Sequence, residues 1–184
     1  MKRVFDIVLS FISIIFLLIP LIIIIILIRL TSKGNALFWS KRVGRDGITF
    51  LMPKFRSMRL ETPDIASHLI SDPEQYFTPI GKFLRKYSLD ESIQFVSVLK
   101  GDMSLVGPRP AGPIELANYK EWQKRRLSVM PGLTGPWQVS GRNKINHFDD
   151  WVRLDLEYID NWSLWLDIKI LFKTIPAAFR GTGM

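Results

Sequence analysis

The chain has no cysteine and only two histidines, His68 and His147, among its 184 residues. The absence of cysteine excludes disulfide bonds, a thiol nucleophile, and zinc or iron–sulfur centres built on cysteine. Two histidines that lie so far apart in the sequence argue against a histidine-built metal site and against a Ser-His-Asp triad. The carboxylates therefore remain as the candidate catalytic groups.

Negative charge is also in short supply. The sequence has 25 lysine and arginine residues against 17 aspartate and glutamate residues, which gives a net charge of +8. Such a basic excess is typical of proteins that bind nucleic acid, an anionic membrane surface or a phosphorylated small substrate. A membrane segment lies in the same short chain, so lipid headgroups and phosphates are favoured and no nucleic-acid partner is expected.

Residues 4–28 are almost wholly apolar and end in a run of leucine and isoleucine. About 20 such residues suffice for a helix to cross the bilayer core. Lysine and arginine, which prefer the cytoplasmic side, lie on both sides of the segment. Pro20, near its middle, removes a backbone donor and can bend or break the helix. We therefore predict a re-entrant helix-break-helix over 1–30 and a cytoplasmic-face domain over 31–184, with a kinked spanning helix as the alternative.

Outside that segment, the sequence predicts a mainly α fold with a small β-hairpin. After a Gly/Asn/Ser link over 31–40, residues 43–50 place an Asp-Gly turn between β-forming residues, which is typical of a hairpin. Ser88 is expected to cap one helix and Gly101 to follow its end. The last expected helix has the composition of an amphipathic helix in a membrane interface, with a core-facing helix as the alternative. The expected helices cover about 78–87, 89–99, 113–128, 148–161 and 164–179.

Asp90 and Glu91 are the first candidate catalytic residues and the candidate metal ligands. They stand at the start of a predicted helix, where the helix dipole stabilises negative charge and favours bound phosphate. Arg109 lies between Pro108 and Pro110, so its guanidinium is preorganised to bind phosphate. The simpler alternative is that the carboxylates only cap a helix and that the cations are solvated surface charges. The cations nearest this pair in the motifs are Lys54, Arg56, Arg85, Lys86 and Lys100.

These groups together indicate phosphoryl transfer near a lipid surface. A carboxylate can attack phosphorus to give an intermediate of the aspartyl-phosphate type. Mg²⁺ held by Asp90 and Glu91 would neutralise a diphosphate and aid the leaving nucleotide. Two other functions stay open: a basic membrane-anchored module that binds acidic lipids or nucleic acid without catalysis, and a membrane phosphatase that uses water as the acceptor.

The order of motifs along nearly the whole chain resembles that of the bacterial sugar transferases, the monotopic polyprenyl-phosphate phosphoglycosyl transferases. The motifs before the candidate pair are Lys2-Arg3-Val4-Phe5-Asp6, Arg42-Val43-Gly44-Arg45, Lys54-Phe55-Arg56-Ser57-Met58 and Thr78-Pro79-Ile80-Gly81-Lys82-Phe83-Leu84-Arg85. The motifs from the pair onward are Ser88-Leu89-Asp90-Glu91, the stretch Lys100 to Pro110, Pro131-Gly132-Leu133-Thr134-Gly135, Trp137 to Asn143, and Tyr158 to Leu164.

The resemblance implies that Asp90 is a nucleophile that takes a phosphosugar from a UDP-sugar and releases UMP. Glu91 would help to hold Mg²⁺ or assist proton transfer, and polyprenyl phosphate at the membrane would then accept the phosphosugar. The resemblance also implies a location at the cytoplasmic face of the bacterial inner membrane and a role in the first membrane step of glycoconjugate assembly. The further site residues that it implies are Lys54, Arg109, Asp155 and Asp167, with Arg142 as a nucleotide contact. Arg85, one of the cations near the pair, is a further candidate phosphate contact.

The sequence departs from the family pattern at three places near the expected site. Ser92-Ile93 stands where the family usually has Leu-Pro, Pro53 replaces a common aromatic residue, and Ser97 replaces asparagine. None of these changes removes a proposed catalytic group, but they put local site geometry and sugar preference in question. The sugar, the polyprenol length and the oligomeric state are left open by the sequence.

Overall fold

The computed structural model describes residues 1–63, 70, 72–141, 145 and 147–179, and its regular elements are mainly helical. The longer elements, in chain order, are α1 (Lys2–Thr31), β1 (Leu37–Val43), β2 (Thr49–Phe55), α7 (Phe148–Asp160) and α8 (Leu164–Phe179). The short α-helices and strands are α2 (Gly81–Lys86), α3 (Phe95–Lys100), β3 (Ser104–Val106), α4 (Pro113–Ala117), α5 (Glu121–Lys124), β4 (Gly132–Thr134) and α6 (Pro136–Val139). The 3₁₀ helices are η1 (Arg45–Gly47), η3 (Pro73–Tyr76), η4 (Leu89–Gln94) and η5 (Arg125–Ser128). The predicted mainly α class with a small sheet is confirmed.

The predicted hairpin is present and is longer than the sequence indicated. β1 pairs antiparallel with β2 from Val43 opposite Thr49 to Leu37 opposite Phe55. The turn passes through Asp46, which has a φ of 55°, and Gly47. β1 therefore begins inside the stretch that the sequence had indicated as a link. A second pair, in which β3 runs parallel to β4, was not predicted.

The helix expected over 89–99 consists of two segments, a 3₁₀ turn (η4) followed by α3. Ser88 precedes η4 in the left-handed conformation, with φ 54° and ψ 25°, and makes no side-chain capping hydrogen bond. The expected cap at Ser88 is therefore wrong, because that left-handed residue turns the chain instead. Gly101 ends α3 with a φ of 99°, as predicted.

The helix expected over 113–128 is divided into α4, α5 and η5. The Glu115 carboxylate accepts a hydrogen bond from the Gly112 amide at 2.8 Å, which fixes the start of α4. A second start follows at Lys120, whose amide donates to the Gln123 side chain at 2.7 Å. Because each segment has its own N-terminal hydrogen bond, the polypeptide turns between them instead of continuing as one helix.

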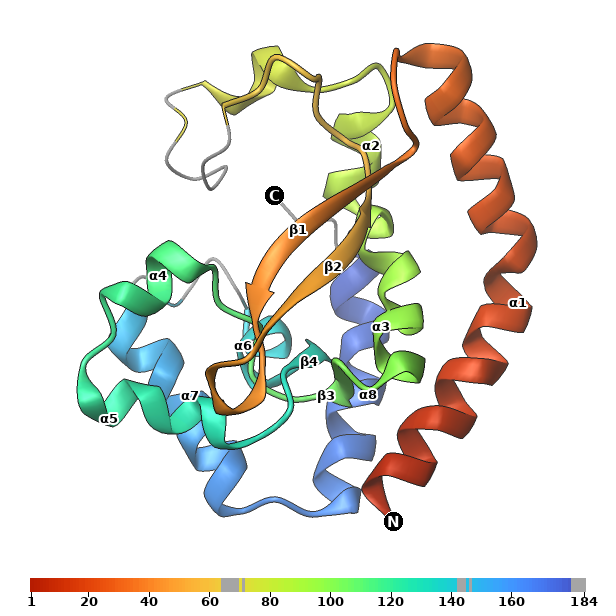
Figure 1. Cartoon of the computed structure of the whole chain (residues 1–184). Helices are drawn as coiled ribbons and strands as arrows, with labels where there is room; N and C mark the ends of the chain where they lie inside the picture. The colour runs from red at the N-terminus through yellow and green to blue at the C-terminus, as the bar shows by residue number, and fades with distance from the viewer. Residues whose placement is uncertain (64–69, 71, 142–144, 146, 180–184) are drawn as a thin grey trace.

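α1 is one continuous helix of 30 residues with Pro20 inside it. By length and composition it could cross a membrane. Figure 1 shows it as an arc along one side of the molecule. The expected interruption at Pro20 is therefore absent, since the chain accommodates the missing backbone donor without leaving the helical conformation.

Both ends of α1 are packed against the rest of the chain, whereas its middle is exposed. Near the start, the buried Asp6 carboxylate accepts hydrogen bonds from the Ser104 hydroxyl at 2.8 Å and the Leu105 amide at 3.2 Å. Near the end, Ile28 is fully buried, while Phe16 and Ile19 in the middle are 80% and 70% exposed. The apolar middle therefore faces outward from the domain.

Two hydrophobic clusters support the region between β2 and η4. The first joins the hairpin to α3, β3, α7 and α8, and its buried members are Met52, Val98, Met103, Leu105, Val106, Tyr158 and Ile170. The second joins the C-terminal half of α1 to the hairpin and α2, through Leu21, Ile24, Ile28, Ala36, Phe55 and Leu84. β2 belongs to both clusters, so its position relative to η4 is fixed from both sides.

Candidate active site

Asp90 and Glu91 lie in the first turn of η4, which packs against β2. The left-handed turn at Ser88 brings the chain out of α2, and the Glu91 amide donates to the Ser88 carbonyl at 3.2 Å. Asp90 is 7% exposed, and the side chain of Glu91 is 13% exposed. The two carboxylates are thus held in a region with little water, where their interactions with nearby cations are strong.

Glu91 joins two of the predicted cations. Its Oε1 accepts hydrogen bonds from Lys54 Nζ at 2.9 Å and from Arg109 Nη2 at 3.0 Å. Burial alone would raise the pKa of Glu91, but the charges of Arg109 and Lys54 outweigh burial and hold that pKa well below its usual range. Glu91 is therefore ionised at neutral pH and acts as the shared anion of both cations.

Asp90 has a different electrostatic environment, although it is the adjacent residue. Burial raises the pKa of Asp90 to about 6, with Lys54 opposing this shift and the Glu91 charge adding to it. Within the described part of the chain, no group donates a hydrogen bond to the Asp90 carboxylate. Two carboxylates whose pKa values are pushed apart are typical of sites where each has a separate chemical role. Asp90 is the one whose oxygens are available to a ligand.

Arg109 is positioned through its backbone as well as its side chain. Its carbonyl accepts a hydrogen bond from Arg126 Nη2 at 3.1 Å. Arg126 is 3% exposed, pairs with Asp155 at 2.6 Å, and donates to the Tyr119 hydroxyl at 2.6 Å. The Arg126 guanidinium also lies 5.2 Å from the centroid of the Trp151 ring. Breaking such a buried ion pair typically costs about 3–5 kcal/mol, so the loop that carries Arg109 has a firm support.

Asp155 is linked to the pair at Asp90 and Glu91 only through other residues. Asp155 is 1% exposed and contacts Arg126, which in turn contacts Arg109. Arg126 could not be singled out from the sequence, because it is one of several charged residues in the same stretch and nothing local distinguishes it from the others. Its role emerges only from the fold, which brings residues 109, 119, 126 and 155 together.

Asp167 lies in a separate buried polar cluster. It accepts hydrogen bonds from Lys2 Nζ at 2.6 Å, from the Tyr158 hydroxyl at 2.6 Å and from the Trp162 ring nitrogen at 3.2 Å. Lys2 and Tyr158 also donate to the Val106 carbonyl, at 3.1 and 3.2 Å. Asp167 therefore ties the start of α1 to the strand that leads into the Gly-Pro-Arg-Pro loop.

Of the two remaining predicted cations, Arg85 lies within the described residues and makes no hydrogen bond or ion pair with the carboxylate pair. Arg85 donates to the Met58 sulfur at 3.4 Å and lies 5.6 Å from the Phe77 ring centroid. Its charge nevertheless lowers the pKa of Asp90, after larger effects from burial, Lys54 and Glu91. Arg142 lies outside the described residues.

The donor set available for a metal ion consists of two carboxylates. The described residues contain no group of three or more histidine, cysteine, aspartate or glutamate side chains placed to hold a metal. Mg²⁺ is commonly bound through only one or two carboxylates together with water and substrate phosphates. Asp90 and Glu91 are compatible with that mode, because the Asp90 oxygens accept no hydrogen bond from the described residues.

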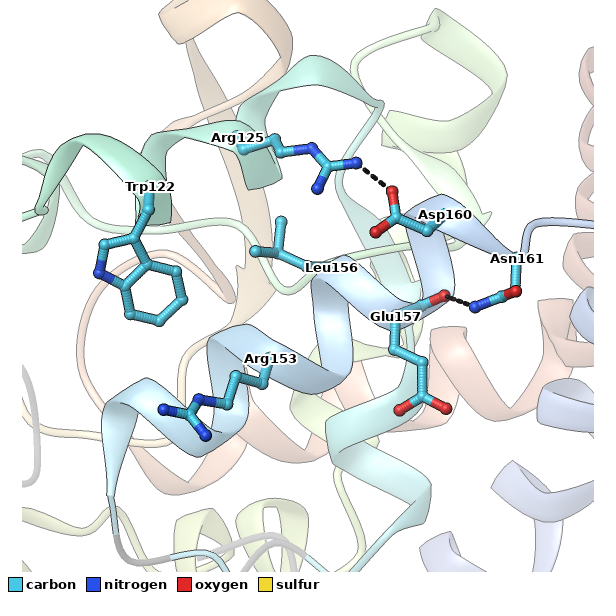
Figure 2. Close-up of a pocket in the computed structure, with 7 residues that line it drawn as sticks. All are labelled: Trp122, Arg125, Arg153, Leu156, Glu157, Asp160 and Asn161. Atoms are coloured by element: carbon cyan, nitrogen blue, oxygen red, sulfur yellow. Dashed lines mark hydrogen bonds and ion pairs between the residues drawn. The ribbon is translucent and has the colours of Figure 1, made fainter.

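A surface groove of about 510 Å³ lies elsewhere, between the α5–η5 segment and α7. Figure 2 shows Trp122, Arg125 and Arg153 around it, with Arg125 paired to Asp160. None of the residues that line this groove was predicted as a site residue. The groove is thus distinct from the cluster of Lys54, Asp90, Glu91 and Arg109.

The whole chain can be compared with known proteins. The family model described as "Bacterial sugar transferase" matches residues 1–181. The galactosyl transferase CpsE of Streptococcus agalactiae is 49% identical over 82% of this chain and 36% of its own length. The undecaprenyl-phosphate galactose phosphotransferase of Salmonella typhimurium is 42% identical, over 100% of this chain and 41% of its own length. The UDP-glucose:undecaprenyl-phosphate glucose-1-phosphate transferase of Escherichia coli is 37% identical, over 97% of this chain and 40% of its own length.

The chain spans about two fifths of the length of these three relatives. The family match, by contrast, includes α1, the hairpin, the carboxylate pair and α8 up to its end. A match of this extent agrees with the resemblance that the sequence motifs indicated. The chain belongs to the bacterial sugar transferase family.

Proposed function

We propose that the chain transfers a sugar phosphate from a UDP-sugar to polyprenyl phosphate, such as undecaprenyl phosphate, and releases UMP. The observation that carries this proposal is the buried Asp90–Glu91 pair, in which Glu91 is neutralised by Lys54 and Arg109 while Asp90 is left available. Two of the relatives are named as transferases that act on undecaprenyl phosphate, and one name includes UDP-glucose as donor. These names support the same classes of donor and acceptor here.

In the first step of the proposed reaction, an Asp90 carboxylate oxygen attacks the phosphorus that bears the sugar. A bond forms between that oxygen and phosphorus, while the bond from phosphorus to the bridging oxygen breaks. The bridging oxygen keeps the electron pair and leaves as part of UMP. In the second step, a phosphate oxygen of polyprenyl phosphate attacks the same phosphorus, and the bond to Asp90 breaks. The carboxylate is restored and the product is a polyprenyl-diphosphate-sugar.

The other residues of the cluster would stabilise charge and hold geometry. Lys54 and Arg109 face the carboxylate pair, so they are placed to contact the diphosphate of the donor. Arg126 and Asp155 hold the Arg109 carbonyl and so restrict where that guanidinium can go. Asp90 and Glu91 would hold Mg²⁺, which when bound supplies neutralisation of the diphosphate charge.

We also propose that α1 enters and leaves the membrane on the cytoplasmic side, as a bent re-entrant helix. Both of its ends are bonded to the same domain: Arg3 donates to the Val98 carbonyl at 2.7 Å, and Arg56 donates to the Ser32 hydroxyl at 3.0 Å. A helix that crossed the bilayer would carry one end away from the domain and break one of these contacts. This placement would bring the carboxylate pair close to a lipid phosphate at the surface.

The direct test is UMP release by the purified chain in lipid nanodiscs with Mg²⁺, undecaprenyl phosphate and a panel of UDP-sugars. We expect release with at least one sugar, dependent on the lipid phosphate, and a fall of about 1,000-fold or more in Asp90→Asn. Asp46→Asn, in the exposed hairpin turn, is a matched control that should keep full activity. Sugar phosphate hydrolysis without lipid phosphate would instead indicate a phosphatase. If folded protein releases no UMP with any UDP-sugar of the panel, the proposal is contradicted.

A further inference from the structure

Arg42, near the end of β1, lies beside the loop that carries Arg109. The amide of the next residue, Val43, donates to the Ala111 carbonyl at 2.9 Å, and these two residues form an isolated bridge. Ala111 directly follows the Pro-Arg-Pro sequence. The end of the hairpin is therefore fastened to this loop, and the fold places a second arginine next to the first.

The Arg42 guanidinium is only partly used by the protein. Its Nε donates to the Ser40 hydroxyl at 3.1 Å. Within the described residues, its two terminal nitrogens have no hydrogen-bond acceptor and no carboxylate lies within ion-pair distance. A Cβ at Gly112 would be in ordinary contact with Nη1, at 3.7 Å, so Gly112 lies beside that nitrogen. The Arg42 side chain is half-buried, and its terminal nitrogens are not among the buried unpartnered atoms of the described residues, so they can be reached by water or by an anion.

Charges of both signs surround Arg42. Burial lowers the pKa of Arg42, and the Arg109 charge lowers it further, against the opposing effects of Glu115 and Glu91. Glu91 is already shared between Lys54 and Arg109, and Glu115 accepts the Gly112 amide. Lys54, Arg109 and Arg42 therefore lie in one region. The carboxylates of Glu91 and Glu115 in this region already have hydrogen-bond partners. Among these cations, Arg42 is the one whose terminal nitrogens have no acceptor within the described residues, and a bound phosphate would accept hydrogen bonds from them.

We infer that Arg42 and Arg109 together form a binding subsite for a phosphate group, with Arg42 supplying the second guanidinium. This inference rests on the proposed function, because it assigns one of that reaction's phosphates to the subsite. The ligand class is a phosphate ester anion. It has two sources in the proposed reaction: the nucleotide phosphate that departs in UMP, and the phosphate of the polyprenyl acceptor.

The test compares Arg42→Met and Arg42→Lys with Arg45→Met in the full chain in lipid nanodiscs. Arg45 lies three positions further along the same hairpin, is 57% exposed, and pairs with Asp46, so it is a matched control. The quantities to measure are KM for the UDP-sugar, the inhibition constant of UMP, and KM for undecaprenyl phosphate. We expect Arg42→Met to raise at least one of these constants by about 10- to 100-fold, the loss typical of a charge-assisted hydrogen bond. Arg42→Lys should give a smaller rise, since it keeps the charge but not the planar fork.

The pattern of the change identifies the source of the phosphate. A rise in the KM for the UDP-sugar and in the inhibition constant of UMP, with an unchanged KM for undecaprenyl phosphate, assigns the subsite to the nucleotide. A rise in the KM for undecaprenyl phosphate alone assigns it to the lipid. If all three constants stay within about twofold of wild type, as expected for Arg45→Met, the inference is wrong even though the transferase activity stands. Should Arg42→Met fail to fold, as judged by circular dichroism, Arg42→Lys carries the comparison.

Equilibrium binding separates this inference from the proposed function. Binding of UMP and of a short-chain polyprenyl phosphate is measured by calorimetry on wild type, Arg42→Met and Arg45→Met. If the wild type shows no turnover with any donor but Arg42→Met binds one of these phosphates about 10-fold more weakly, the subsite stands without the proposed function. Equal binding by all three proteins overturns the subsite.

Discussion

Asp90 and Glu91 show how two adjacent residues of nearly the same chemistry acquire different properties. Glu91 accepts hydrogen bonds from two cations, which lower its pKa more than burial raises it. Among the described residues Asp90 has no such donor, so burial dominates and raises its pKa to about 6. At neutral pH both are ionised, but only Asp90 has oxygens that are free to form a bond with phosphorus. The residue that is less stabilised as an anion is the better candidate nucleophile.

The raised pKa of Asp90 leads to a prediction about pH. Because only the ionised carboxylate attacks, kcat/KM should fall by about tenfold per pH unit on the acid side, with a midpoint near pH 6 at low Mg²⁺. The midpoint should move to lower pH as Mg²⁺ is raised, because a bound cation favours the ionised carboxylate. Lys54→Met removes a charge that lowers the pKa of Asp90, so it should move this midpoint to higher pH. The measurement is the initial rate of UMP release at low donor concentration between pH 5 and 8. Lys82→Met, an exposed lysine on α2 paired with Glu74, should leave the midpoint unchanged. A flat profile, or a shift to lower pH in Lys54→Met, would contradict this assignment.

Among single residues, the sequence singled out Lys54, Glu91 and Arg109, which the structure brings together, but it did not single out the residues that support them. Arg109 was identifiable because prolines on both sides of an arginine restrict its backbone, and this signal is local. Asp155 and Asp167 looked like surface charges until the family resemblance was considered, and the structure shows both to be almost fully buried. Their partners, Arg126 and Lys2, lie 29 and 165 positions away. No local pattern reports a pairing across such distances.

Among the elements, α1 is the one that bears most directly on the proposed membrane topology. Its outward-facing middle is apolar, and its two ends carry the polar contacts to the domain. A straight helix of this length would extend about 45 Å, which exceeds the hydrocarbon thickness of about 30 Å. The bend seen in Figure 1 keeps both ends against the domain. The element is therefore suited to a re-entrant path.

The re-entrant path can be tested with single cysteines, because the chain has none of its own. Val4→Cys and Lys33→Cys mark the two ends of α1, and Ile19→Cys marks its middle; Val4 and Ile19 are 65% and 70% exposed. A membrane-impermeant maleimide should label both end positions in inverted vesicles, neither in right-side-out vesicles, and the middle position in neither. Pro20→Ala restores a backbone donor and should straighten α1, so that the position 4 label moves to the opposite side in part of the molecules. Opposite sidedness of positions 4 and 33 in the otherwise unchanged protein would establish a spanning helix.

Other elements differ in how far the sequence could predict them. The hairpin was predictable because Asp46-Gly47 defines its turn locally. β3 and β4 are three residues each, too short for a strand pattern, and they pair only because the fold brings them together. A side chain at Gly132 would stand 2.1 Å from the Gly107 amide nitrogen, so this close approach of two loops requires glycine. The reason for that glycine becomes visible only once both loops are placed.

In the molecule as a whole, the apolar helix α1 and the cluster around Asp90 and Glu91 form one packed unit. Leu21, Ile24 and Ile28 of α1 belong to the same hydrophobic cluster as Phe55, the residue after Lys54. Arg3 caps the last turn of α3 through the Val98 and Leu99 carbonyls, at 2.7 and 3.0 Å. α3 follows η4 directly, so α1 helps to position the segment that carries Asp90. In this arrangement the carboxylate pair proposed to bind the nucleotide-sugar is packed together with the apolar helix proposed to enter the membrane.

If Asp90 carries the sugar phosphate between donor and acceptor, intact-protein mass spectrometry should detect the covalent adduct. The chain is incubated with its UDP-sugar and Mg²⁺ but without lipid phosphate, quenched, and compared with Asp90→Asn. We expect the mass of the protein to increase by one sugar phosphate, and peptide mapping should locate this adduct on Asp90. The adduct should be absent from Asp90→Asn and should be lost when undecaprenyl phosphate is added. UMP release without any such adduct, at a rate that Asp90→Asn retains, would contradict this role of Asp90.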